Sequence, residues 1–289
     1  MTDTAKLLID SRCALGEGPF WHPLREALFW FDINAFKLHA AAADGTMIRT
    51  WSFDEHVAAA AVIDRDRLAV ATETGLVQLD LQTNERQVLM PLEADQTATR
   101  TNDSRVDRTG GFWISTMLKD EGDPGGTVYR FREGKIETLI EKVAIPNSIC
   151  FSPDGRIAYF TDTPTRRILQ CDTVDGVLVG EWRLFADVSD HRGYPDGSVT
   201  DSAGYVWNAR WGGSCVVRHA PDGSIDRIVE LPVSQVTCPA FGGPDYKTLF
   251  ITTANKTLSA DQLAREPQAG GVFAIEVDVP GLPEPALVL

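Results

Sequence analysis

The chain has 289 residues, of which 43% are hydrophobic, and its 27 basic and 41 acidic residues give a formal net charge of −14. This length and composition allow a sizeable buried core and exclude the disordered and fibrous classes of protein. The excess of acidic residues would repel a phosphate backbone, so we expect no nucleic acid partner.

The amino-terminal segment and the cysteines indicate a cytoplasmic protein. Residues 1–12 contain no long apolar run preceded by positive charge, which distinguishes them from a secretory signal. No stretch approaches the roughly 18 apolar residues that a membrane span requires, so we expect no membrane partner. The five cysteines are scattered, their number is odd and no Cys-x-x-Cys motif occurs. This pattern is typical of reduced thiols and argues against a zinc knuckle.

The predicted elements are short β-strands along the whole chain. Apolar or alternating runs recur between Gly, Pro, Asp and Asn residues, and helical periodicity is hard to find. The six strongest runs, whose first residues we call the anchors, begin at Leu28, Leu68, Phe112, Ala158, Val206 and Leu249. Consecutive anchors lie 40, 44, 46, 48 and 43 positions apart. Repeats of this length, each with several short strands, predict an all-β fold, a six-bladed β-propeller.

The other strands of each repeat follow the anchors, separated by turn signals such as Asp44-Gly45. A second run starts at Lys37, Leu76, Thr127, Arg167, Ser214 and Gly271. A third run follows in several repeats, for example from Ile136. We expect residues 1–289 to form a single propeller domain. Lys6–Ser11 is predicted to be the outer strand that closes the last blade and removes the free sheet edges.

A ring of polar residues is predicted where the six blades meet. Counting back 10 or 11 positions from the anchors reaches the inner strands, at Glu17, Val57, Asn102, Asn147, Asp196 and Cys238. Four of these six side chains carry oxygen, and Glu17 and Asp196 would repel each other without a cation. The ring therefore predicts one divalent cation in the central channel, either Ca²⁺, Mg²⁺ or Mn²⁺, with Fe²⁺ or Zn²⁺ as alternatives.

Residues outside the ring are predicted to reach the same mouth of the channel. The chain that enters an inner strand and the chain that leaves the next strand lie on one face of the propeller. This places Arg100, Glu121 in the loop Lys119–Gly126, and the loop Ser189–Tyr194 around the mouth. Arg100 is a candidate for binding a carbonyl or hydroxyl group, and a surface ion pair is the alternative. His191 is a candidate base, and an incidental loop histidine is the alternative.

The same residues lie in motifs that resemble the SMP-30/gluconolactonase family, also called the regucalcin-like lactonases. The motifs are LGEGPFWH, RTNDSRVD, GGFWISTM, IPNSICFSPDGRIAYFTD and YPDGSVTDSAGYVWNARWGG. The resemblance runs from about residue 13 to residue 213 and, more thinly, to about residue 279. It implies a six-bladed propeller with one divalent metal in the channel, bound by Glu17, Asn147 and Asp196.

The resemblance also implies an activity, the hydrolysis of a sugar lactone to the aldonic acid. In this interpretation Arg100, Asn102 and Glu121 bind the substrate, and Asp196 is the proton donor or acceptor. The chain departs from the family pattern at Ser104, where the family often has Gly, and at Cys150, just beyond the Asn147 motif. Neither departure removes a ligand.

A lactone is a cyclic ester, and these residue types suit its hydrolysis. A metal would polarise the carbonyl, and Asp196 would act as general base and then as general acid. No G-x-S-x-G motif occurs, so a serine nucleophile is not supported. The expected substrate is a small sugar lactone such as glucono-, xylono-, arabino- or galactonolactone, and the sequence predicts no particular oligomeric state. Two alternatives stay open: a phosphotriesterase- or arylesterase-like hydrolase on the same fold, and a non-catalytic calcium-binding propeller.

Overall fold

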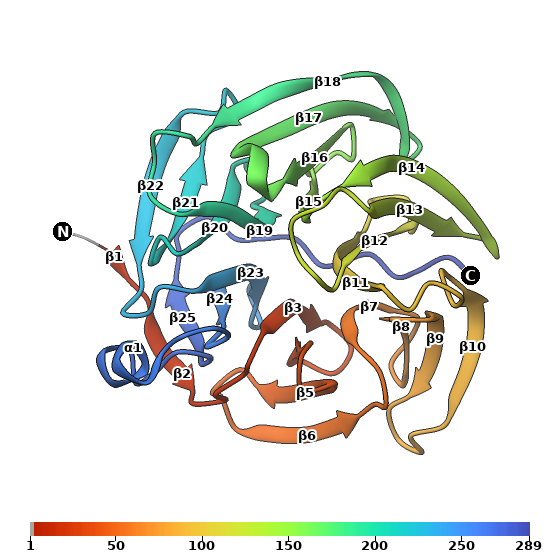
Figure 1. The fold of residues 1–289 in the computed structure, drawn as a ribbon, viewed down its shortest axis with the longest axis horizontal. Helices are drawn as coiled ribbons and strands as arrows, with labels where there is room; N and C mark the ends of the chain where they lie inside the picture. The colour runs from red at the N-terminus through yellow and green to blue at the C-terminus, as the bar shows by residue number, and fades with distance from the viewer. Residues whose placement is uncertain (1–2) are drawn as a thin grey trace.

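A computed structural model describes residues 3–289, and it contains six β-sheets, the blades, arranged around a central axis (Figure 1). Blade one, from the axis outward, contains β3 (Gly16–His22), β4 (Ala27–Asp32), β5 (Lys37–Ala42) and β6 (Met47–Ser52). Blade two contains β7 (Val57–Val62), β8 (Arg67–Thr72), β9 (Gly75–Asp80) and β10 (Arg86–Pro91). Blade three contains β11 (Thr99–Val106), β12 (Phe112–Leu118), β13 (Gly126–Arg132) and β14 (Lys135–Val143).

The last three blades continue the same order from the axis outward. Blade four contains β15 (Pro146–Phe151), β16 (Ile157–Asp162), β17 (Arg167–Val174) and β18 (Val177–Asp187). Blade five contains β19 (Tyr194–Thr200), β20 (Val206–Trp211), β21 (Cys215–His219), β22 (Ile225–Glu230) and β1 (Asp3–Thr4). Blade six contains β23 (Val236–Gly242), β24 (Thr248–Thr253), β25 (Val272–Glu276) and β2 (Lys6–Ile9). The predicted six-bladed propeller is confirmed, and each anchor lies in the second strand of its blade.

The start of the chain closes the ring. Strand β2 pairs antiparallel with β25, which confirms the predicted outer strand of the last blade. Strand β1 was not predicted, and it pairs in parallel with β22 on the outside of blade five. The first residues of the structure therefore connect two neighbouring blades, and the edges of both sheets are covered.

The hydrophobic core lies between blades rather than at the axis. The second strand of blade one, β4, is buried at all six positions, whereas the outer strand β6 is exposed at five of six. One cluster joins Phe31 of blade one to Val57 and Leu68 of blade two. Because the blades bury their apolar faces against each other, the inner strands are free to present polar side chains to the channel.

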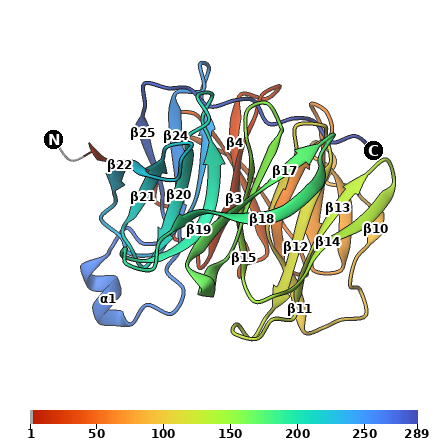
Figure 2. The same cartoon turned by 90° about the horizontal axis from the view of Figure 1, so that it is seen from above.

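The last residues of the chain cross the propeller on the face opposite the short helix α1 (Ala260–Arg265) (Figure 2). We call residues 278–289 the tail. It joins blade two where the Leu287 amide donates to the Val62 carbonyl at 2.8 Å. Beneath the ring, Glu284 of the tail forms an ion pair with the buried Arg105. The tail therefore covers one end of the channel. No helix among the described residues is long and apolar enough to span a membrane.

Candidate functional site

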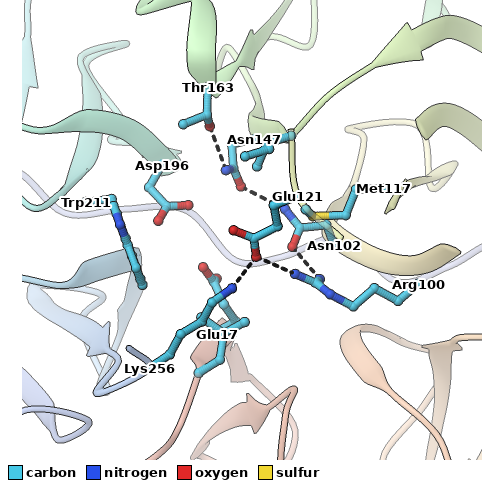
Figure 3. Close-up of a pocket in the computed structure, with 12 residues that line it drawn as sticks. Glu17, Arg100, Asn102, Met117, Glu121, Asn147, Thr163, Asp196, Trp211 and Lys256 are labelled. Carbon is cyan, nitrogen blue, oxygen red and sulfur yellow. Dashed lines mark hydrogen bonds and ion pairs between the residues drawn. The ribbon is translucent and has the colours of Figure 1, made fainter. Parts of the chain in front are cut away.

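A cavity opens at the other end of the channel, lined by polar and charged side chains from several blades. All six residues that the sequence predicted for the site line this cavity: Glu17, Arg100, Asn102, Glu121, Asn147 and Asp196. Figure 3 shows the side chains of Glu17, Asn147 and Asp196 pointing into one space, although they come from blades one, four and five.

A bulge in each inner strand accounts for this arrangement. The strand register shifts between Glu17 and Phe20 in blade one and between Asn147 and Cys150 in blade four, and equivalent shifts occur in the other four blades. An extra residue bends the strand and redirects the side chains beside it. In blade one the bulge requires Gly18, whose φ is +53° and whose added Cβ would lie 2.2 Å from a carbonyl oxygen of blade two.

The acidic side chains of the site lie in a space that disfavours negative charge. Glu17 and Asp196 are 7% and 6% exposed, and neither has an ion-pair partner among the described residues. Burial raises the pKa of both carboxyl groups. Repulsion from Asp103 raises the pKa of Glu17 further, and repulsion from Glu17 and Asp103 raises that of Asp196. Burial also raises the pKa of Asp103 to about 6. A cation held among these groups would remove the repulsion.

The amide of Asn147 is oriented by its neighbours. Its Nδ2 donates to Thr163 Oγ1 at 2.8 Å, and the Thr163 hydroxyl donates to the carbonyl of Pro195 at 2.8 Å. Asn102 Nδ2 donates to Asn147 Oδ1 at 3.3 Å and to the Pro146 carbonyl at 2.9 Å. With its nitrogen committed to Thr163, Asn147 presents its oxygen to the cavity (Figure 3).

Arg100 is a buried cation at the edge of the cavity. Its Nη1 donates to Asn102 Oδ1 at 2.8 Å, and its Nη2 lies 3.8 Å from Glu121 Oε1. Burial lowers the pKa of Arg100, and the charges of Glu121, Glu17 and Asp196 oppose that change. The guanidinium therefore lies between the polar ring and the loop that carries Glu121.

Several site residues were missed by the sequence analysis. They are Asp103 beneath the ring and, at the cavity, Thr163, Trp211 and Lys256. The last three lie at or just after the ends of the second strands β16, β20 and β24. Strand direction placed Glu121 at the mouth because it follows the second strand β12. The same reasoning, applied to the second strands of the other blades, would have found these three residues.

Three other predicted positions lie outside the cavity. Val57 and Cys238 occupy their ring positions on β7 and β23, but both are fully buried and neither lines the cavity in the part of the chain that the structure describes. His191 is exposed, and Arg166 Nη2 donates to its backbone carbonyl at 2.5 Å. This contact holds the loop against blade four. Among residues 3–289 His191 is not one of those that line the cavity, so the structure does not support it as a base.

The donor set fits a hard divalent cation. Two carboxylates and one amide oxygen converge from Glu17, Asp196 and Asn147, and oxygen ligands are those that Ca²⁺, Mg²⁺ and Mn²⁺ prefer. No group of three His, Cys, Asp or Glu side chains suited to a metal occurs among residues 3–289. The amide oxygen is therefore needed to complete a set of three ligands.

The family to which this chain belongs follows from a direct match to a family model. A family model described as the SMP-30/Gluconolactonase/LRE-like region matches residues 15–255, which include the whole ring. The chain belongs to this family. The resemblance predicted from the motifs is thus confirmed, and membership in the SMP-30/gluconolactonase family agrees with the six-bladed propeller.

Relatives within the SMP-30/gluconolactonase family match this chain over nearly its whole length. An L-arabinolactonase of Azospirillum brasilense is 39% identical over 96% of this chain and 93% of its own. A 6-deoxy-6-sulfogluconolactonase of Pseudomonas putida is 34% identical over 99% of both chains. The crystal structure of a calcium-binding protein, regucalcin, from Agrobacterium tumefaciens superposes with a TM-score of 0.96, at 34% identity and with 100% of both chains covered.

Proposed function

We propose that this protein hydrolyses a sugar lactone to the aldonic acid, with residues 1–289 acting as one catalytic domain. The observation that carries the proposal is the convergence of two buried carboxylates and an oriented amide oxygen beside a buried arginine. The names of the two lactonase relatives support the same reaction.

One divalent cation is the proposed cofactor, with Glu17, Asn147 and Asp196 as its ligands. When bound there, such a cation supplies Lewis-acid chemistry at the ester carbonyl. The repulsion between the buried carboxylates supports this proposal, because it gives the site a reason to bind positive charge. The Agrobacterium tumefaciens regucalcin is described as a calcium-binding protein, so calcium is the first metal to test.

The chain's own residues supply the proton transfers and the orientation of the substrate. Asp196 accepts a proton from the attacking water and then returns it to the ring oxygen as the ester C–O bond breaks. Arg100 donates hydrogen bonds to oxygen atoms of the lactone, and Asn102, whose Nδ2 is already committed, accepts from a hydroxyl group of the lactone at Oδ1. Glu121 accepts hydrogen bonds from the hydroxyl groups of the lactone.

A non-catalytic calcium-binding protein is the second candidate, which the similarity to the calcium-binding regucalcin favours. This candidate predicts tight calcium binding without turnover. It gives Arg100 and Glu121 no role, whereas lactone hydrolysis gives both of them a task.

Lactone hydrolysis is tested by assaying purified protein on a panel of aldono-1,4- and 1,5-lactones with Ca²⁺, Mg²⁺, Mn²⁺, Zn²⁺ and Fe²⁺ in turn. Paraoxon and phenyl acetate serve as comparison substrates. We expect turnover of at least one aldonolactone with a kcat/KM well above that for either comparison substrate. Metal binding without turnover of any lactone would favour the second candidate. Faster turnover of paraoxon or phenyl acetate would show that the preferred substrate is another kind of ester.

A further inference from the structure

Lys256 reaches the cavity from outside the ring. It follows β24 in blade six, and its ammonium group contacts Glu121 Oε1 from blade three (Figure 3). The same oxygen lies 3.8 Å from Arg100 Nη2. One carboxylate on the rim is therefore shared between two cations that come from different blades.

The backbone of Lys256 is held in place on both sides. Its amide donates to the Ala14 carbonyl at 3.0 Å, and its carbonyl accepts from Gln235 Nε2 at 2.5 Å. The side chain is 21% exposed, so much of its aliphatic stem is covered. These contacts distinguish Lys256 from a freely mobile surface lysine, because its ammonium group starts from a fixed point on the cavity wall.

The Lys256–Glu121 pair is suited to hydroxyl groups. An ammonium group only donates hydrogen bonds and a carboxylate only accepts them, whereas a hydroxyl group does both. Glu121 is 38% exposed, and an ion pair open to solvent contributes little stability, so a substrate can insert between the partners at low cost. A hydroxyl group placed there would accept from Lys256 and donate to Glu121.

The positive charge of Lys256 is already matched before a substrate binds. Three carboxyl groups line the cavity, those of Glu17, Glu121 and Asp196, and Arg100 and Lys256 are its two cations. Because Lys256 is paired with Glu121, the pair presents no uncompensated charge to a ligand and suits an uncharged one.

We propose that Lys256, together with Glu121, binds the hydroxyl groups of a neutral sugar lactone on the side away from the ester carbonyl. This inference rests on the proposed lactone hydrolysis and extends it, because it names the part of the substrate that sets specificity. Lys256 thereby acts in substrate binding and takes no part in the proton transfers.

The experiment compares Lys256→Met and Lys256→Arg with the wild type on two substrates with the same five-membered ring. L-Arabinono-1,4-lactone carries hydroxyl groups and γ-butyrolactone has none. With saturating metal, Lys256→Met should raise KM for the sugar lactone roughly 10-fold, the range expected for a lost hydrogen bond to a charged group, and leave kcat within about twofold. Its kcat/KM for γ-butyrolactone should not change, and Lys256→Arg should recover part of the lost affinity.

Lys247→Met is the matched control, because Lys247 belongs to the same blade but lies outside the cavity, with its carbonyl bonded to Val277 beside the tail. It should behave as the wild type. Equal losses on both substrates, or an unchanged KM for the sugar lactone, would overturn the assignment of Lys256. If the wild type hydrolyses the sugar lactone but Lys256→Met leaves its KM unchanged, hydroxyl recognition by Lys256 fails while the proposed function stands. If the wild type hydrolyses no sugar lactone, the proposed function itself fails.

Discussion

Asn147 donates a hydrogen bond from Nδ2 to Thr163 Oγ1 at 2.8 Å, and this contact decides which atom of the amide faces the cavity. Thr163 has its own hydroxyl proton committed to the Pro195 carbonyl, so it accepts from Asn147 and cannot donate to it. The orientation of one candidate ligand is therefore set by a residue of the short turn after β16 that lies behind it.

Thr163→Val should weaken metal binding while leaving the ligands in place. Valine has a similar shape but accepts no hydrogen bond, so the buried Asn147 nitrogen loses its partner and the amide is free to turn. We expect the dissociation constant for the metal to rise roughly 10- to 100-fold, as for other residues that orient ligands. Calorimetric titration of metal-free protein measures this value. Thr165→Val, in the exposed part of the same turn, should bind metal as the wild type does, and an unchanged constant for Thr163→Val would contradict the orienting role.

Removal of divalent cations should destabilise the fold and abolish lactone hydrolysis. A metal that binds only the folded protein stabilises it by about 2.7 kcal/mol when its concentration is 100 times the dissociation constant. Thermal unfolding with and without chelator, followed by addition of Ca²⁺ or Mn²⁺, measures this shift. Glu17→Gln should lose most of the metal-dependent shift. Identical melting curves for the loaded and stripped wild type would exclude a cation among the ring carboxylates.

The Asp196→Asn variant should show whether Asp196 is only a metal ligand or also transfers the proton. Asparagine keeps the size and one oxygen but removes the charge and the basicity, so excess metal should not restore activity. We expect activity to stay reduced by roughly 10²- to 10⁴-fold at saturating metal. Asn147→Ala should instead recover partly as the metal concentration is raised. Near-normal turnover by metal-loaded Asp196→Asn would falsify the proton-transfer role.

Stability should fall in mild acid because of a buried histidine in blade five. Burial, with a contribution from the charge of Arg210, lowers the pKa of His219 from 6.5 to about 4. Arg210 Nη2 donates to His219 Nε2 at 2.8 Å, which requires the neutral ring. Because the folded-state pKa is the lower one, the unfolded chain takes up the proton first. The resulting stability is present above pH 6.5 and is lost as the pH falls toward 4.

This single group should cost on the order of 2 kcal/mol of unfolding free energy between pH 7 and pH 5. Urea unfolding of the wild type and of His219→Gln at the two pH values tests it, because the variant should lose less stability than the wild type. His191→Gln, which changes an exposed histidine, is the control and should follow the wild type. Equal losses for His219→Gln and the wild type would rule out His219 as the source.

The ion pair between Arg105 and Glu284 should matter for stability far more than a surface pair. The two side chains are 9% and 20% exposed, so Glu284→Gln leaves the buried Arg105 without its ion-pair partner. We expect a loss of about 3 kcal/mol in unfolding free energy by urea denaturation. Asp10→Asn breaks the exposed pair with Arg12 and should have no measurable effect. A Glu284→Gln protein as stable as the wild type would mean that the tail is not held by this pair.

The sequence was sufficient for the fold and for the ring because both depend on a repeat. The anchors recur at nearly constant spacing, and residues at one offset from them must lie at one height around the axis. Glu17, Asn102, Asn147 and Asp196 were found in this way, before any contact between them was known.

The other residues of the site could not be predicted from the spacing of the repeats. Thr163 and Lys256 lie in connections whose length and course differ between blades, and Asp103 shares a strand with Asn102 but lies beneath the ring. The loop with His191 precedes β19 at the end that carries Asp196, as strand polarity predicted, but His191 itself does not line the cavity in the described part of the chain. Arg166 holds that loop by its carbonyl groups, and such a long-range contact leaves no periodic signal in the sequence.

The position of the tail has a consequence for how substrate enters and product leaves the cavity. Residues 278–289 cross one end of the channel (Figure 2), and the cavity lies at the other end. The acid product therefore leaves the cavity on the side from which the lactone enters, past Lys256 and Glu121 on the rim. In the proposed reaction the aldonate and the lactone would occupy the same cavity, so we expect the aldonate to inhibit competitively and a later reaction that consumes it to relieve the inhibition.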